Sequence, residues 1–153
     1  MHFRQFFKHI PSIFIGSLAF QFIKIDNNRL GAVNTLRTCE GTEIVYSSKA
    51  RTLMDAVYDW SRFNSLPRGY DWIRKEIKED LKFRMELVEV AGQYGNQATA
   101  RRIGYLLESI LQDPQLLIKP QRQLSDSKAL IPWIPGRPAK GTVNRKWGLI
   151  VNG

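Results

Sequence analysis

The sequence has few of the residues on which most enzyme chemistry depends. Of its 153 residues, one is cysteine and two are histidine. Cys39 by itself can form neither an intrachain disulfide nor a thiolate metal site, which fits a reducing compartment, so we expect the chain to be cytoplasmic. His2 and His9 lie near the N-terminus without a plausible triad. They therefore indicate no catalytic site.

Signatures of nucleotide binding are also missing. The sequence contains no glycine-rich turn followed by Lys and Ser or Thr, and it contains no dinucleotide-binding fingerprint. We therefore expect a protein that is not an enzyme and that carries no cofactor and no metal.

One carboxylate pattern leaves an alternative open. Asp55 and Asp59 lie one helical turn apart, and Glu40 and Glu43 precede them, so a metal-dependent nuclease is a weaker hypothesis that a magnesium-dependent cleavage assay would test. The competing interpretation is that these are solvated helix charges, with Arg51 pairing Asp55 four residues away.

Long apolar runs are absent. A helix that crosses a membrane needs about 20 consecutive apolar residues. Basic residues precede an apolar run from Ile10 to Phe20, which is the arrangement of a signal peptide, but Pro11 and Gly16 interrupt that run. We expect a buried strand or helix at the start of the domain and no membrane partner.

Acidic residues are scarce in the C-terminal third. The chain carries 23 Lys plus Arg against 14 Asp plus Glu, a net charge of +9. Residues 101–153 hold nine of the basic residues and only three of the acidic ones. A local basic excess favours a polyanionic partner or an acidic protein surface, although some such proteins are merely basic.

The pattern of residues predicts an α+β fold. Strands are expected at 20–25, 30–36 and 42–48, followed by a helix from about Lys49 to Phe63 that Ser48 caps. A second helical region spans about 70–93, with a possible break near Asp80 to Phe83. We expect a small, mostly antiparallel sheet with a closing C-terminal strand, packed against three or four helices in one domain over 1–153, in which residues 1–19 form an N-terminal segment.

The next helix follows Asn96, a favoured N-cap residue. Its apolar residues recur at helical spacing and predict a face towards the core: Thr99, Ile103, Leu106, Leu107 and Ile110. Arg101, Tyr105 and Glu108 fall opposite that face. Small residues at Ala100 and Gly104 predict the close approach of another element.

Prolines and basic residues dominate the segment from 114 to 146, which predicts a loop region before a final strand that begins near Trp147. Basic residues interleaved with aromatic ones suit phosphate contacts and base stacking. The candidate residues for binding nucleic acid or a partner are Arg101, Arg102, Tyr105, Arg122, Arg137, Lys140, Arg145 and Lys146. Trp147 is expected in the core.

Three stretches resemble the C-terminal domain of the AbiEi family, the antitoxins of bacterial type IV toxin–antitoxin systems that act in abortive infection. They are "KARTLMDAV" at 49–57, "LVEVAGQYGNQATARRIGYLLE" at 87–108 and "WIPGRPAKGTVNRKWGLIVN" at 133–152. The likeness covers most of the chain from about Phe20, and the second stretch is the most specific of the three.

The resemblance implies a regulatory antitoxin whose gene is paired with that of a nucleotidyltransferase-like toxin. In the family, an N-terminal winged helix binds operator DNA, and the C-terminal domain carries antitoxicity. Ala50 stands where the family has Glu, and residues 1–20 are too short for a winged helix. The alternative is a free-standing, basic nucleic-acid-binding module. The paired Arg101 and Arg102 are expected to project into a basic surface, unless Arg102 packs on the domain and pairs with Glu108 or Asp113.

Overall fold

The computed structural model describes residues 12–111, 114–122, 124 and 129–153. The chain divides into two compact units, Met1–Leu30 and Gly31–Gly153. This differs from the single domain expected over 1–153. A segment of about 30 residues is too short to bury a core of its own, so composition gave no sign of a separate unit.

The first unit contains a hairpin of β1 (Ser12–Ile15) and β2 (Leu18–Gln21), followed by a short 3-10 helix, η1 (Asn27–Arg29). The expected burial of this segment is wrong, because Phe14 is 71% and Ile15 65% exposed. Successive side chains of a strand point to opposite faces, and a two-stranded hairpin has no second layer to cover either face. His2 and His9 lie outside the described residues.

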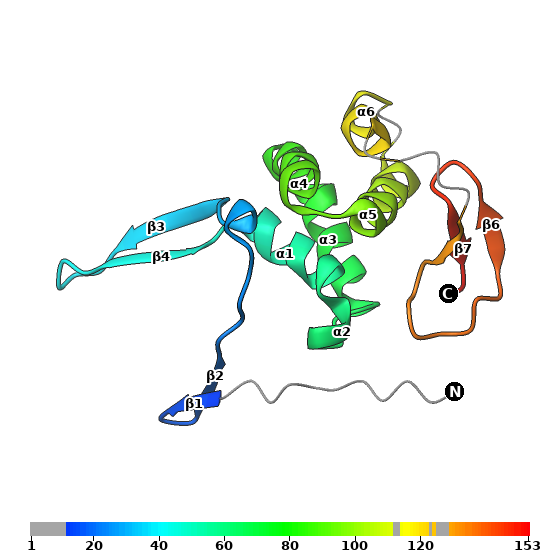
Figure 1. Cartoon of the computed structure of the whole chain (residues 1–153). Coiled ribbons are helices and arrows are strands. Elements are labelled where there is room, and N and C mark those ends of the chain that lie inside the picture. The colour runs from blue at the N-terminus through cyan, green and yellow to red at the C-terminus, as the bar shows by residue number, and fades with distance from the viewer. Residues whose placement is uncertain (1–11, 112–113, 123, 125–128) are drawn as a thin grey trace. The chain divides into compact units, whose positions relative to one another are not determined.

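The second unit is built around helices (Figure 1). They are α1 (Lys49–Tyr58), α2 (Trp60–Phe63), α3 (Arg68–Glu79), α4 (Leu81–Tyr94), α5 (Gln97–Ile110) and α6 (Pro114–Arg122). The side chains of Ser48 and Asn96 accept the capping hydrogen bonds of α1 and α5, as predicted. The predicted break falls at Asp80, whose extended backbone ends α3 and whose carboxylate caps α4.

The largest buried side chains of this unit come from α1, α3, α4 and α5, from the strand at 149–151 and from the turn before it. The fully buried ones are Trp147, Tyr70, Met54, Ile73, Ile77, Leu87, Ile103, Leu106, Leu107, Leu149, Val57 and Thr99. Four of the five residues on the predicted core face of α5 are among them, and Ile110 packs at the edge of the core. Trp147 lies in the core, as expected.

The loop predicted over 114–146 is wrong at its beginning, where residues 114–122 form α6. Pro114 occupies the first helical position, where the missing N–H has no intrahelical acceptor in any case. Pro120 lies inside the helix and gave a misleading signal, since proline removes one hydrogen bond without abolishing a short helix that packs on α4 and α5.

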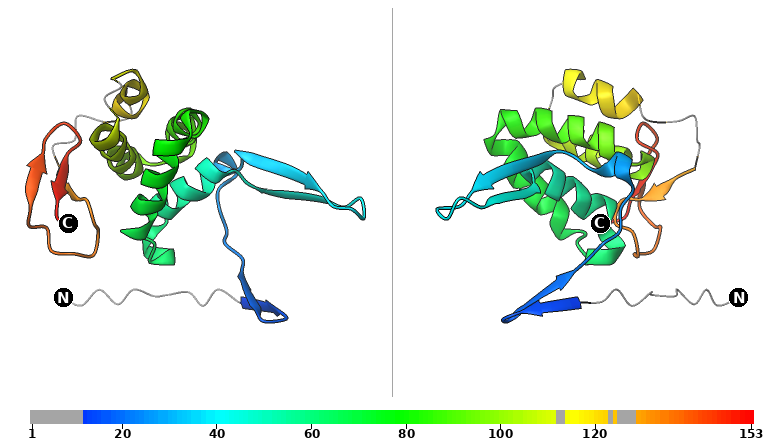
Figure 2. Two further views of the ribbon diagram at one scale, coloured as in Figure 1. Left: turned by 180° about the vertical axis from the view of Figure 1, so that it is seen from behind. Right: turned by 60° about the vertical axis from the view of Figure 1, so that its left-hand side comes forward.

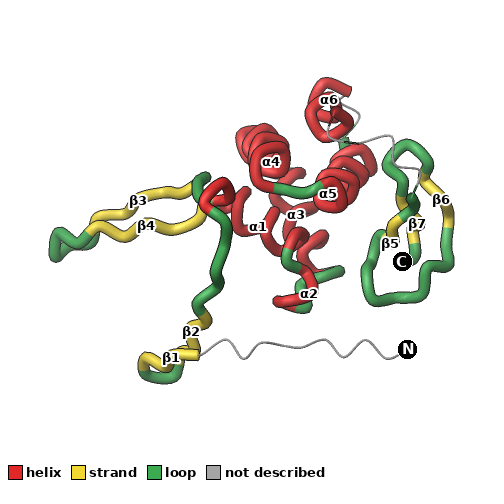
Figure 3. The backbone as a smooth tube through the Cα atoms, viewed as in Figure 1, coloured by secondary structure: helices red, strands yellow, loops and turns green. Residues whose placement is uncertain are grey.

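The strands of the second unit form two separate sheets (Figure 3). One is an antiparallel hairpin of β3 (Val33–Arg37) and β4 (Glu43–Ser47). The other contains β5 (Ile131–Pro132), β6 (Thr142–Asn144) and the closing strand β7 (Leu149–Val151), in the order β5-β7-β6. The α+β class with small, mostly antiparallel sheets is confirmed, although the strands do not join into one sheet.

The two sheets of this unit differ in their relation to the helices. The β3–β4 hairpin extends away from the helices with all ten strand residues exposed, whereas the C-terminal sheet lies beside α5 (Figures 1 and 2). None of the helices in the described part of the chain has the length and apolarity needed to span a bilayer.

Candidate binding surface at the C-terminal sheet

The C-terminal sheet covers the side of α5 that faces away from the helical core. Trp147 lies against Gly104, and a Cβ atom at Gly104 would come within 3.0 Å of three atoms of the indole ring. The indole is fully buried. The close approach that the small residues of α5 predict is therefore made by Trp147, and no side chain larger than a hydrogen atom fits between them.

Glu108 holds the turn between β6 and β7 against α5. Its Oε2 accepts a hydrogen bond of 2.6 Å from Trp147 Nε1, and its Oε1 accepts one from Lys146 Nζ. Burial opposes ionisation of this carboxyl, but the hydrogen bonds from Lys146 and Trp147 outweigh burial, so the pKa of Glu108 lies below its usual value. Glu108 is thus ionised at neutral pH and neutralises one of the predicted surface cations.

The expectation that Arg101 and Arg102 project into a basic surface is wrong. Their side chains are buried, with 4% and 6% exposure. Arg101 Nη1 donates to the carbonyl of Ala129 at 2.7 Å, and Arg102 Nη2 donates to that of Pro132 at 3.1 Å. Helical periodicity placed Arg101 opposite the apolar face correctly, but it could not show that a second layer covers that side.

Arg102 interacts electrostatically with Tyr70, which belongs to a cluster of three aromatic rings. The rings of Tyr70 and Trp133 stack with centroids 3.8 Å apart, and Tyr105 meets Trp133 edge-on at 4.9 Å. Tyr70 Oη donates a hydrogen bond of 2.7 Å to the carbonyl of Trp133. Burial lowers the pKa of Arg102 and raises the pKa of Tyr70. The predicted alternative for Arg102 is confirmed in its packing, but the hydrogen bond from its Nη2 goes to a backbone carbonyl. Of the two acids predicted as its partner, Glu108 binds Lys146 and Trp147, and Asp113 lies outside the described residues.

Asn152 closes the C-terminal sheet and was not anticipated from the sequence. Its Oδ1 accepts from the backbone N–H of Ile134 at 2.8 Å. Its Nδ2 donates to the carbonyls of Ile134 at 3.0 Å and Pro138 at 3.1 Å. The side-chain amide of Asn152 thus makes hydrogen bonds with the backbone of the proline-containing loop that a neighbouring strand would otherwise make. No local sequence pattern predicts these hydrogen bonds, because the partners of Asn152 lie 14 and 18 residues away in the chain.

The remaining candidate cations are exposed but do not form one cluster along the fold. Arg145 and Lys146 lie in the turn between β6 and β7, whereas Arg137 and Lys140 precede β6 at the opposite end of that hairpin. Arg122 is at the end of α6. Residues 131–153 contain four basic residues and no acidic one. The surface of the C-terminal sheet is therefore basic, while the paired arginines beneath it bind the backbone at Ala129 and Pro132.

One of the carboxylates considered for a metal site, Asp55, binds an arginine. Arg51 Nε donates to Asp55 Oδ2 at 2.8 Å, so the predicted ion pair is confirmed. Within the described ranges, no three His, Cys, Asp or Glu side chains come together in a way that could hold a metal ion.

Comparison of the chain with protein-family models, with curated proteins and with solved structures gave no match.

Proposed function

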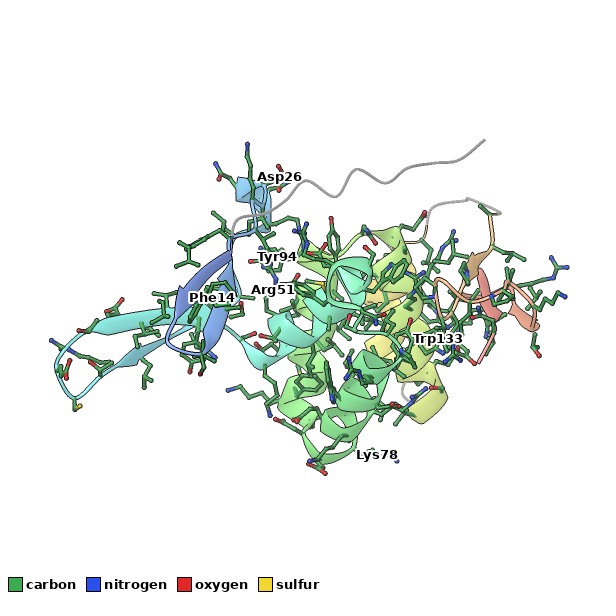
Figure 4. The ribbon with its side chains drawn as sticks, turned by 90° about the horizontal axis from the view of Figure 1, so that it is seen from below. Phe14, Asp26, Arg51, Lys78, Tyr94 and Trp133 are labelled. Carbon is green, nitrogen blue, oxygen red and sulfur yellow. The ribbon has the colours of Figure 1, made fainter. Side chains whose placement is uncertain are left out.

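We propose that the chain is an antitoxin domain that counters a nucleotidyltransferase-like toxin of a type IV system. The observation that carries the proposal is that the three stretches resembling AbiEi antitoxins contact one another. Arg51, in the first stretch, lies over the ring of Tyr94, in the second, with 4.6 Å between Cζ and the ring centroid (Figure 4). Trp133 and Trp147, in the third stretch, pack on Tyr105 and Gly104 of the second.

This contact pattern supports the resemblance in a specific way. The residues that make these contacts include Arg51, Gly104 and Trp147, which belong to the resembling motifs themselves. The same pattern explains the residue types, because glycine at 104 and glutamate at 108 are what Trp147 requires. The proposal assigns the chain no enzyme activity.

Growth rescue tests the proposal. We expect a nucleotidyltransferase-like reading frame next to the gene for this chain, and we expect cells that express that toxin to recover growth when the chain is supplied in trans. The control is Gly104→Trp, which disrupts the packing of the C-terminal sheet and should abolish rescue. Growth arrest that persists in the presence of soluble, folded chain would refute the antitoxin assignment.

A second candidate function is nucleic-acid binding. The observation that favours it is the run of four basic residues without an acidic one in 131–153, three of which have no carboxylate partner among the described residues. Phosphate contacts release condensed counterions, so such binding would weaken steeply with salt. Because Arg101 and Arg102 are buried, they should not contribute directly.

A matched pair of triple variants separates this function from non-specific attraction. Replacing Arg137, Lys140 and Arg145 with Gln should weaken binding to a DNA duplex and flatten its salt dependence. Replacing the exposed cations Lys75, Lys78 and Lys82 with Gln changes the net charge equally on α3 and α4. If both variants lose the same affinity, binding follows net charge and the C-terminal sheet is not a nucleic-acid interface.

A further inference from the structure

The β3–β4 hairpin exposes apolar side chains on both of its faces. Alternation along the strands places Val33 and Val45 on one face, and Leu36, Ile44 and Tyr46 on the other. All five are between 44% and 59% exposed. An isolated two-stranded hairpin in water is marginally stable, and apolar surface of this kind marks an interaction site.

The base of the hairpin is firmly attached to the helices. Ser48 N donates to the carbonyl of Ala32 at 2.8 Å, and Arg51 Nη1 donates to that of Gly31 at 3.1 Å. Arg51 is buried and lies beside Tyr94 (Figure 4). These hydrogen bonds therefore fix the base of the hairpin to α1, while its exposed strands can pair with another strand.

The hydrogen-bond register identifies the groups that the outer edge of β4 offers. The bonds from Thr38 N to Thr42 O and from Ser48 N to Ala32 O mark hydrogen-bonded pairs at both ends of the hairpin. Such pairs alternate along an antiparallel ladder. Glu43, Val45 and Ser47 therefore direct their N–H and C=O groups away from β3, towards the outer edge, which pairs with no other strand of the described chain.

We propose that this edge pairs with β4 of a second copy of the chain, antiparallel and centred on Val45, to form a symmetric dimer. In this register Val45 faces Val45 and Glu43 faces Ser47, and all of these residues direct their backbone groups outward. The non-hydrogen-bonded pairs between them are Ile44 with Tyr46, an aromatic and β-branched combination that stabilises antiparallel strands. Side-chain and backbone complementarity thus agree on one register.

The residues of the hairpin favour a second copy over other occupants. Arg37, Glu40 and Glu43 leave residues 33–47 with one net negative charge, which disfavours nucleic acid and anionic membranes. The β4 sequence "EIVYS" contains neither proline nor lysine, the residues that commonly protect edge strands. In the β4 register no like charges face each other. The equivalent pairing of two β3 strands would place apolar side chains opposite polar ones, with Val33 against Arg37 and Asn34 against Leu36.

Site-specific crosslinking tests the register. Cys39 is the only cysteine, so Cys39→Ser gives a background in which a single new cysteine reports one position. Val45→Cys in that background should give a covalent dimer with a short thiol-specific crosslinker, because facing residues of a hydrogen-bonded pair have Cβ atoms about 5.5 Å apart, which a crosslinker spans but an unstrained disulfide does not. Thr35→Cys, the cross-strand neighbour on β3, should not. Equal crosslinking at both positions would overturn the β4 register.

A pair of proline variants tests the dimer without a crosslink. Thr35 and Val45 both direct their N–H groups away from the hairpin, so neither Thr35→Pro nor Val45→Pro removes a β3–β4 hydrogen bond. By sedimentation equilibrium, we expect the unmodified chain and Thr35→Pro to form dimers, and Val45→Pro to raise the dissociation constant at least about tenfold. A chain that is monomeric throughout, or that loses dimerisation equally in both variants, would overturn the proposal and leave the edge to a different protein or to another segment of the same polypeptide.

Discussion

Gly104→Ala is the sharpest test of how the C-terminal sheet is held on α5. The added Cβ atom would lie 2.1 Å from the nearest atom of Trp147, whereas ordinary contact begins at 3.4 Å, so the ring or the helix would have to move by more than about 1 Å. The ring cannot move freely, because Glu108 accepts from its Nε1 and Asn144 accepts from its backbone N–H.

Two opposing effects determine the expected magnitude. Alanine stabilises a helix interior by about 1 kcal/mol relative to glycine. Overpacking of a core costs about 1–3 kcal/mol, and loss of the hydrogen bond from Trp147 to Glu108 adds about 1–3 kcal/mol because it leaves a buried donor unpaired. We therefore expect a net loss of about 1–5 kcal/mol in the free energy of unfolding.

Chemical denaturation followed by tryptophan fluorescence measures this loss. Gly69→Ala is the matched control, because a Cβ atom at that helical glycine would meet its neighbours at 3.4 Å or more. We expect the control to keep or slightly increase stability. If Gly104→Ala were as stable as the unmodified chain, the contact between α5 and Trp147 would not be the constraint that we describe.

Three further predictions concern the same region. The pKa of Glu108 in the folded chain is depressed, so the stabilisation that this carboxylate contributes should be complete above the unfolded pKa of about 4.3 and should be lost as the pH falls through the folded pKa. Below the folded pKa, the unmodified chain and Glu108→Gln should therefore have the same free energy of unfolding. Asn152→Ala should lower the free energy of unfolding by about 1–3 kcal/mol, because it leaves the buried backbone groups of Ile134 unpaired. An unchanged denaturation midpoint would show that water replaces the side-chain amide. Arg102→Ala should lower the free energy of unfolding by about 2 kcal/mol and Arg137→Ala by less than about 0.5 kcal/mol, and equal effects would contradict the burial of Arg102.

Local signals predicted the helices well where the cause is local. Ser48 and Asn96 cap helices because their side chains reach backbone N–H groups three residues away, and Asp80 interrupts a helix for the same reason. The spacing of Ile103, Leu106 and Leu107 predicted burial because helical geometry places them on one side. Such interactions connect neighbours in the chain, so they can be inferred from the order of residues.

The partners of the paired arginines depended on contacts between distant segments. An arginine on the polar side of a helix is exposed in most proteins, and here Arg101 and Arg102 are buried because backbone carbonyls of 129 and 132 arrive from beyond α6. The one local clue was Gly104, which indicated that some element approaches closely but not which one.

The sequence by itself determined the caps of α1, α4 and α5, the α+β class, the basic character of the C-terminal third and the ion pair of Arg51 with Asp55, because each follows from composition or from residues a few positions apart. Only the tertiary structure decided that α5 is covered on two sides and that the strands form separate sheets. Both outcomes depend on which distant backbone groups satisfy one another, and hydrophobic periodicity contains no information about that choice.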